Sequence, residues 1–330
     1  MTVLVTGGAG YIGSHMVLAL SDARRPVVVL DDLSTGSRGA VPSTVALVQG
    51  CCGDEGLLDN VIRDHGVTAI VHFAGSIVVP DSVTDPLGYY LNNTVRSRAL
   101  IAAAVRGGVK SFVFSSTAAV YGEGAAEPLR ETAALDPVSP YGASKLMTER
   151  MLADASRAHG FAYAALRYFN VAGADPSGRA GQSTPRATHL IKVAAEAVTG
   201  KRDRLQIFGD DYPTPDGTCV RDYIHVSDLA KAHVLALDYL ARTGENLVAN
   251  CGYGRGASVL EVIDSVKRVS GVDFPVERAP RRPGDPALLV ADPTRARTTL
   301  GWRPDYDDLD TIVSHALAWE RKIAARAAAE

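Results

Sequence analysis

The chain has 330 residues, a length typical of about two domains and long enough for a packed core without disulfides. Hydrophobic residues make up 46% of it, and 34 Lys and Arg against 37 Asp and Glu leave a net charge of −3. This composition excludes a disordered chain and provides no positive field for nucleic acid or an anionic membrane. Without a basic signal-peptide region or an apolar run near the ~20 residues of a membrane span, we expect a cytoplasmic protein.

The four cysteines are Cys51, Cys52, Cys219 and Cys251. The adjacent pair fits neither a C-x-x-C redox motif nor the spacing of zinc ligands. We therefore predict reduced thiols and no metal site.

In the first half, short apolar runs alternate with helical segments. Strands are predicted at residues 3–6, 26–30, 46–49, 69–74, 111–115 and 161–168, and helices at 11–23, 57–65, 87–105 and 141–159. Nearly continuous apolar strands indicate a parallel sheet buried between helices. The fold class predicted is α/β, a doubly wound parallel sheet with a smaller C-terminal α/β region.

After residue 170 the composition changes. Loops are predicted at residues 174–186 and 210–217, and mixed short elements include 226–242, 258–269 and 311–328. We predict a nucleotide-binding domain over 1–170 and a substrate-binding domain over 171–330. Part of the latter, about 220–242, is expected to pack back onto the sheet. The alanine-rich end, 324–330, is expected to fray.

A glycine-rich turn, Gly7-Gly8-Ala9-Gly10-Tyr11-Ile12-Gly13, lies between the first strand and the first helix. Glycines allow the backbone to approach a pyrophosphate, and the helix N-terminus offers free N–H groups to it. Asp31 ends the second strand and can accept both adenosine ribose hydroxyls, which favours NAD over NADP. A turn aspartate is the other interpretation of Asp31.

Tyr141 and Lys145 are four residues apart and share one helix face. A tyrosine base at neutral pH needs its pKa lowered by about 3 units from about 10, and a nearby ammonium stabilises the phenolate. Thr117 ends the fifth strand, where ligands sit in such sheets. Its hydroxyl can bond a reacting oxygen or simply cap the strand.

Together the motifs TGGAGYIGSH, FSSTAAVYG, SPYGASK, RYFN and VRDYIHV resemble the extended short-chain dehydrogenase/reductases, and within them the group of UDP-sugar 4-epimerases. The resemblance covers residues 3–302. It implies NAD-dependent interconversion of UDP-glucose and UDP-galactose through a 4-keto sugar. It also implies a homodimer that pairs residues 87–105 and 141–159 across a two-fold axis.

The resemblance also implies roles for individual residues. The catalytic residues are Thr117, Tyr141 and Lys145. The NAD contacts are Gly7, Gly10, Tyr11, Ile12, Gly13, Asp31, Phe73, Ala74, Gly75, Asn93, Tyr141, Lys145 and Tyr168. The UDP-sugar contacts are Thr117, Asn170, Leu190, Phe208, Arg221, Arg282, Asp285 and Leu289.

Three positions depart from the family pattern. Cys51 replaces a carboxylate near the adenine amine, and Ile77 replaces a lysine after the fourth strand. Leu289, at the position that limits the sugar pocket, is of intermediate size and leaves N-acetylhexosamine, pentose and uronate sugars open as substrates. A 4,6-dehydratase is a less favoured alternative, because Ala118 and Ala119 after Thr117 cannot transfer protons. A non-catalytic NAD-binding regulator has no use for a tuned tyrosine.

Overall fold

The computed structural model describes residues 1–123, 128–184, 187–282 and 285–327. Its largest sheet has seven strands in the order β10-β6-β5-β4-β1-β2-β3, with every neighbouring pair parallel. The strands are β1 (Thr2–Thr6), β2 (Val27–Asp31), β3 (Ala46–Gln49), β4 (Val67–His72), β5 (Ser111–Thr117), β6 (Ala162–Tyr168) and β10 (Leu247–Cys251). The order reverses between β1 and β4, as in a doubly wound sheet, so the predicted fold class is confirmed.

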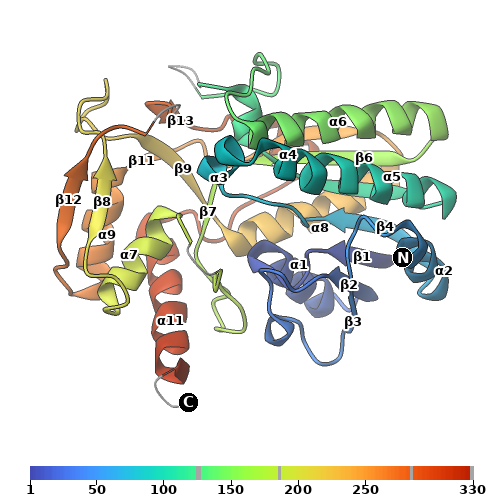
Figure 1. Cartoon of the computed structure of the whole chain (residues 1–330), viewed down its shortest axis with the longest axis horizontal. Helices are drawn as coiled ribbons and strands as arrows, with labels where there is room; N and C mark the ends of the chain where they lie inside the picture. Colours follow the sequence, from blue (N-terminus) through green and yellow to red (C-terminus); the bar gives the residue numbers. More distant parts are fainter. Residues whose placement is uncertain (124–127, 185–186, 283–284, 328–330) are drawn as a thin grey trace.

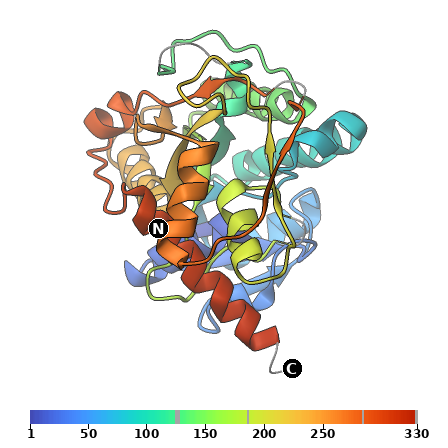
Figure 2. The same cartoon turned by 90° about the vertical axis from the view of Figure 1, so that its left-hand side faces the viewer.

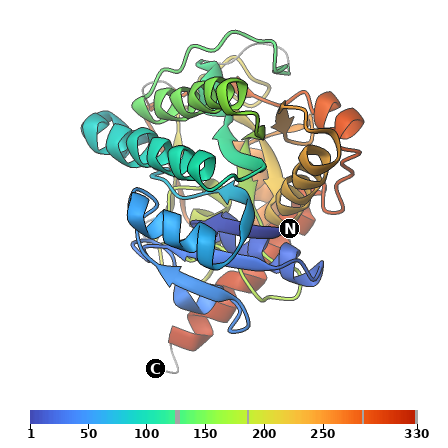
Figure 3. The same cartoon turned by 90° about the vertical axis from the view of Figure 1, so that its right-hand side faces the viewer.

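Helices cover both faces of this sheet (Figures 1 and 3). The helices α1 (Tyr11–Asp22) and α8 (Val226–Thr243) pack together, and α2 (Glu55–Asp64), α5 (Arg96–Arg106) and α6 (Pro140–His159) form a second layer. Alternate side chains of a strand pack on opposite faces of the sheet. Val3 and Val5 belong to one apolar core, and Leu4 belongs to the other. Among the helices of the described residues, none is long and apolar enough to cross a bilayer.

The C-terminal region has two smaller sheets. One contains β7 (Asn170–Ala172), β9 (Val220–His225), β11 (Gly256–Ser258) and β13 (Leu288–Leu289), and the other pairs β8 (Leu205–Phe208) with β12 (Val276–Ala279). The helices are α7 (Leu190–Val198), α9 (Val259–Ser270), α10 (Thr294–Thr299) and α11 (Leu309–Ala327). In Figure 2, α11 descends beside α7 and α9 and contacts both. The last three residues of the segment expected to fray, 328–330, lie outside the described residues.

The chain crosses between the two regions more than once. Helix α8 contacts α1, β5 and β6, and β10 then pairs with β6 at the edge of the large sheet. Residues 226–251 therefore complete the first sheet and its helical layer before the chain returns to the smaller region. The division at residue 170 stays a prediction.

The single helix predicted over residues 87–105 is wrong in detail. The structure has α3 (Val79–Thr84), α4 (Pro86–Tyr89), a π-helical turn η2 (Tyr90–Val95) and then α5. Two short 3₁₀ helices, η1 (Arg38–Ala40) and η3 (Ala118–Tyr121), were also not predicted. A π turn rotates the side chains that follow it and is frequent at functional sites. Here it contains Asn93, one of the predicted NAD contacts.

Four histidines are buried in the fold: His15, His72, His225 and His233. Burial disfavours the charged imidazolium and lowers the pKa of His72 and His225 to about 3, and that of His15 and His233 to about 4. The unfolded chain takes up these protons near pH 6.5, whereas the folded chain does so only near pH 3 to 4. Stability is therefore lost as the pH falls below 6.5.

We expect His233→Asn to reduce this acid sensitivity. His233 Nδ1 bonds the Leu229 carbonyl at 2.9 Å, and an asparagine amide can replace that bond without titrating. The slope of the unfolding free energy against pH between 5 and 6.5 should become smaller, because about one proton fewer is taken up on unfolding. Urea unfolding at several pH values measures this slope. The same replacement at the exposed His159 is the control. An unchanged slope in His233→Asn would contradict the assignment.

Candidate active site

The glycine turn joins β1 to α1 with its backbone closely packed. Gly7 has a φ of 72°, and a Cβ there would lie 2.6 Å from the Ala74 nitrogen. A Cβ on Gly13 would lie 2.1 Å from the Gly7 carbonyl oxygen. Gly10 occupies the N-cap of α1 and brings no side chain to the helix N-terminus. The cradle therefore suits a phosphate group on the free N–H groups of the helix end.

Asp31 lies at the end of β2, next to this turn. Its carboxylate accepts the backbone N–H groups of Ala9 and Leu33, each at 2.9 Å. Burial raises the pKa of Asp31, and these two hydrogen bonds act in the opposite direction. The contacts anchor the carboxylate beside the glycine turn, where the predicted ribose contact requires it.

The π turn brings Asn93 back to the segment that follows β4. Asn93 Oδ1 accepts the Ser76 N–H at 2.8 Å, and its Nδ2 donates to the Ser76 carbonyl at 3.0 Å and to Ser144 Oγ at 3.1 Å. Phe73 packs against His233 with ring centroids 4.8 Å apart. The predicted NAD contacts Gly75 and Asn93 thus meet between β4 and α6, where a Cβ on Gly75 would lie 2.9 Å from Asn93 Oδ1, whereas Phe73 contacts α8.

The three predicted catalytic residues lie at the carboxyl end of β5 and the first turns of α6. Thr117 ends the strand, and Tyr141 belongs to the first turn of α6. Lys145 follows one turn later and donates from Nζ to the Ser115 carbonyl at 3.1 Å. All three side chains are buried. The structure therefore brings together the residues that the sequence placed in one reaction.

Their pKa values differ from the expectation drawn from the Tyr-x-x-x-Lys spacing. Burial raises the pKa of Tyr141, and the Thr117 hydrogen bond offsets only part of that rise. Burial also lowers the pKa of Lys145 to about 8, because the low-dielectric site disfavours the ammonium. The expected lowering of the Tyr141 pKa is therefore absent in the protein alone. A further positive charge is needed to stabilise the phenolate.

Thr117 also has a capping role. Its Oγ1 accepts the Ala119 N–H at 3.1 Å and caps η3. A bond to a reacting oxygen and a cap were the alternative interpretations of this residue; the structure shows the cap, and the bond to a reacting oxygen stays a prediction. Ala118 and Ala119 follow directly and place no acid or base beside it.

The predicted substrate contacts form three groups. The Arg282 guanidinium lies 3.7 Å from the centroid of the Phe208 ring, a cation–π pair at the end of β8. Arg221 on β9 forms an ion pair with Asp285 at 3.2 Å. Leu289 on β13 is the register partner of Arg221. These two groups offer cations, an aromatic face and a carboxylate, as a nucleoside diphosphate requires.

The third group, Asn170 and Leu190, lines a cavity between β7, α7 and α11. Tyr223, the register partner of Asn170 on β9, lines it too and was missed by the sequence analysis. Trp319 and Glu320 of α11 complete the wall. Tyr223 is separated from Arg221 by one residue, but only the β7–β9 pairing places it beside Asn170.

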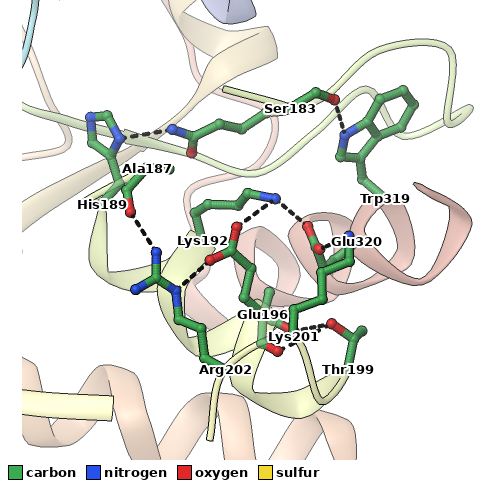
Figure 4. Close-up of polar contacts among 12 residues, drawn as sticks. Ser183, Ala187, His189, Lys192, Glu196, Thr199, Lys201, Arg202, Trp319 and Glu320 are labelled. Atoms are coloured by element: carbon green, nitrogen blue, oxygen red, sulfur yellow. Dashed lines mark hydrogen bonds and ion pairs between the residues drawn. The ribbon is translucent and has the colours of Figure 1, made fainter. Parts of the chain in front are cut away.

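An ionic network centred on the buried Lys192 and Glu320 borders this cavity and joins α7 to α11 (Figure 4). Lys192 pairs with Glu320 and, at 3.3 Å, with Glu196. Lys201 reaches Glu320 at 2.7 Å, and Arg202 reaches Glu196 at 2.5 Å. Because α7 begins at Leu190, the network fixes one wall of the cavity against the C-terminal helix.

Other residues near the site were also missed. His72 bonds Thr6 Oγ1 at 2.6 Å and Ser97 Oγ at 2.8 Å beneath the segment around Gly75. Glu149 follows Lys145 by one turn of α6 and pairs with Arg167 of β6. Tyr141, Lys145 and Glu149 are spaced four residues apart, and this spacing could have indicated that Glu149 shares the helix face of the other two.

Comparison with known proteins gives consistent matches. Residues 3–252 match the NAD dependent epimerase/dehydratase family. The UDP-glucose 4-epimerase of Azospirillum brasilense is 62% identical over 321 residues, which cover 97% of this chain and 92% of that protein. These matches confirm the resemblance seen in the motifs.

Two solved structures are similar over almost their whole length. The UDP-glucose 4-epimerase from Brucella ovis in complex with NAD has a TM-score of 0.93 and 45% identity, covering 96% of this chain and 97% of that chain. UDP-glucose-4-epimerase from Stenotrophomonas maltophila, with bound NAD and formylated UDP-arabinopyranose, has a TM-score of 0.95 and 39% identity, covering 99% of both chains. Fold, sequence and cofactor class agree, and the chain belongs to the NAD dependent epimerase/dehydratase family.

Proposed function

We propose that this chain catalyses NAD-dependent epimerisation of UDP-sugars at C4, with UDP-glucose and UDP-galactose as its substrate pair. The observation that carries the proposal is the arrangement of Thr117, Tyr141 and Lys145 at the carboxyl end of β5. Its support is the 62% identity to a UDP-glucose 4-epimerase over nearly the whole chain. Other UDP-sugars remain the second candidate, because Leu289 is of intermediate size and one neighbour holds a UDP-arabinopyranose derivative.

The proposed NAD site extends from the glycine turn to α6. Gly7 and Gly13 allow the close backbone packing of a turn that would hold the pyrophosphate, and Asp31, anchored by the Ala9 N–H, would accept the ribose hydroxyls. Beyond them, the proposed contacts are Tyr11, Ile12, Phe73, Ala74, Gly75, Asn93, Tyr141, Lys145 and Tyr168. When bound, NAD would supply the acceptor and donor of the C4 hydride and a positive charge on its oxidised ring.

Tyr141 is the proposed base. Its phenolate takes the proton of the sugar 4-hydroxyl and later returns it to the C4 oxygen, so the proton count closes over one turnover. Thr117 orients that oxygen. Lys145, held by the Ser115 carbonyl, is the proposed cation of the site.

The UDP part is held by residues of the smaller region. Arg221 and Arg282 suit the diphosphate, the Phe208 ring provides a face for uracil, and Asp285 accepts from a ribose hydroxyl. Asn170, Leu190 and Leu289 belong to the same proposed site. Anchoring at the nucleotide leaves the 4-keto sugar free to turn over, as inversion at C4 requires.

Two other functions fit less well. A 4,6-dehydratase needs an acid and a base beside Thr117, where the chain has Ala118 and Ala119. A non-catalytic regulator needs no buried threonine–tyrosine–lysine group. The buried set described here therefore favours the epimerase.

We also propose that the protein forms a homodimer through the face of α3, α4, η2 and α6. Apolar side chains are exposed on that face, with relative exposures of 64% for Val83, 79% for Leu87, 53% for Leu91 and 42% for Met147. Exposed apolar residues gathered in one patch favour a protein interface.

The first prediction is turnover without added cofactor. Purified protein should carry NAD and convert UDP-galactose to UDP-glucose, with products identified by NMR alongside UDP-N-acetylgalactosamine and UDP-arabinose. Tyr141→Phe should abolish turnover while UDP binding stays near that of the wild type, since only the ionisable hydroxyl is removed. Loss of water at C6 would overturn the epimerase proposal. No product from any of the three sugars would favour the regulator.

The second prediction concerns the glycine turn. Gly13→Ala should lower the NAD retained after purification by about tenfold or more, because its Cβ meets the Gly7 carbonyl oxygen at 2.1 Å. Gly39→Ala is the matched control, since the nearest atom to its Cβ is 3.7 Å away. Bound NAD is measured by absorbance after denaturation. Equal NAD content in the two variants would refute the cradle assignment.

The third prediction concerns the dimer. Light scattering should give twice the chain mass of 34.8 kDa for the wild-type protein. Leu87→Glu combined with Leu91→Glu should give the single-chain mass, because burying two carboxylates opposes association. Val272→Glu places the same charge at another exposed apolar residue and should remain dimeric. A monomeric wild-type protein would exclude the proposed assembly.

A further inference from the structure

A buried polar cluster ties helix α6 to strand β5 directly behind the catalytic residues. Ser116 Oγ donates to Glu149 Oε1 at 2.5 Å, and Arg167 donates to both oxygens of the same carboxylate, at 2.9 and 2.6 Å. All three side chains are at most 6% exposed. Ser116 and Arg167 are register partners on β5 and β6, so one carboxylate joins two strands and a helix.

The position of this cluster relative to the reaction is specific. Ser116 lies between Ser115, whose carbonyl accepts Lys145 Nζ, and Thr117, the last residue of β5. Glu149 lies one turn beyond Lys145 on α6. Two consecutive residues of β5, Ser115 and Ser116, are therefore bonded to two consecutive turns of α6, which restrains both sliding and rotation of α6 along the strand.

The cluster extends on its far side to the chain around η3. Arg167 Nη1 donates to Tyr121 Oη at 3.1 Å, and its guanidinium lies 5.1 Å from the Tyr121 ring centroid. Tyr121 Oη donates in turn to Asn250 Oδ1 at 2.6 Å. Glu149 thus has partners at its two oxygens, and Arg167 is held in place from a second side.

We propose that Ser116 and Glu149 are positioning residues that set the register of α6 on β5, and so hold Tyr141 and Lys145 at their working distance from Thr117. The proposal rests on the proposed function of those three residues. A buried ion pair alone contributes little net stability compared with apolar residues of the same volume, which leaves geometry as what this pair supplies. Displacements of about 1 Å at reacting groups can cost about 100-fold in rate.

The test compares two buried serines that each donate to a carboxylate. Ser116→Ala removes the link between β5 and α6 but leaves the Arg167–Glu149 pair in place. Ser265→Ala removes an equally buried hydroxyl, which donates to Asp310 at 2.6 Å between α9 and α11. The assay measures kcat and KM for UDP-galactose, retained NAD and Tm for each variant.

We expect Ser116→Ala to lower kcat about tenfold or more, with KM and NAD content within about twofold of wild type. Ser265→Ala should leave kcat within about twofold at a similar change in Tm. Ser116→Thr, which keeps the hydroxyl, should recover most of the rate. Equal kcat in Ser116→Ala and the wild-type protein, or equal losses at both serines, would overturn the proposal.

A double variant separates positioning from folding and keeps the test informative if Ser116→Ala is unstable. Glu149→Leu with Arg167→Met replaces both charges by apolar side chains, so Tm should stay close to that of wild type while kcat remains low. Recovery of both Tm and kcat would assign the cluster to folding alone.

If the wild-type protein is inactive, the proposed function is refuted but the positioning role is not yet tested. A measurement that does not depend on turnover then tests the positioning role. In ¹³C-tyrosine-labelled holoenzyme, the Tyr141 resonance, assigned with Tyr141→Phe, should move in Ser116→Ala and stay fixed in Ser265→Ala. A fixed Tyr141 resonance in both variants would contradict the positioning role.

Discussion

The hydrogen bond from Lys145 to the Ser115 carbonyl, 3.1 Å long, brings an amine into a buried site at the end of β5. An ammonium in such a place loses water, and its pKa falls to about 8 as a result. Neighbouring groups in the site partly offset this loss of hydration. The carbonyl dipole and the face of the Phe114 ring, 5.0 Å from Nζ, are the groups that the fold offers to the charge. Lys145 is one of only seven lysines in the chain, and its side chain is buried in the candidate site.

The same burial shifts the pKa of Tyr141 in the opposite direction, because the charged form of tyrosine is an anion. A phenolate also loses water there, so the pKa of Tyr141 rises in the protein alone, and the Thr117 hydrogen bond reverses only part of the rise. Burial therefore favours the neutral form of the proposed base in the protein alone. A bound oxidised nicotinamide ring would add a positive charge that favours the phenolate, and its reduced form would not.

Local sequence predicted the parts of the fold that depend on neighbouring residues. The glycine turn follows a strand and opens a helix within a few residues, and Tyr141 and Lys145 share a helix face by spacing alone. The π turn at Asn93 was missed, because periodicity cannot distinguish an inserted residue from a continuous helix. The links from Glu149 to Ser116 and Arg167 span 33 and 18 residues, and they require the β5–β6 register to be known. The pairing of Tyr223 with Asn170 was missed for the same reason.

The proposed nucleotide end and the reacting end of the site differ in burial and in hydrogen bonding. The predicted UDP contacts form a cation–π pair and an Arg221–Asp285 ion pair, and the side chains of Arg282 and Asp285 are not fully buried. Arg282 and Asp285 can reorganise around a diphosphate at little cost, since solvent already screens them, whereas Arg221 is buried. The catalytic end is buried and cross-linked by hydrogen bonds to consecutive residues of one strand. A 4-keto sugar has to rotate while the proton and hydride positions stay constant, and an adaptable nucleotide clamp beside a rigid catalytic edge meets both requirements.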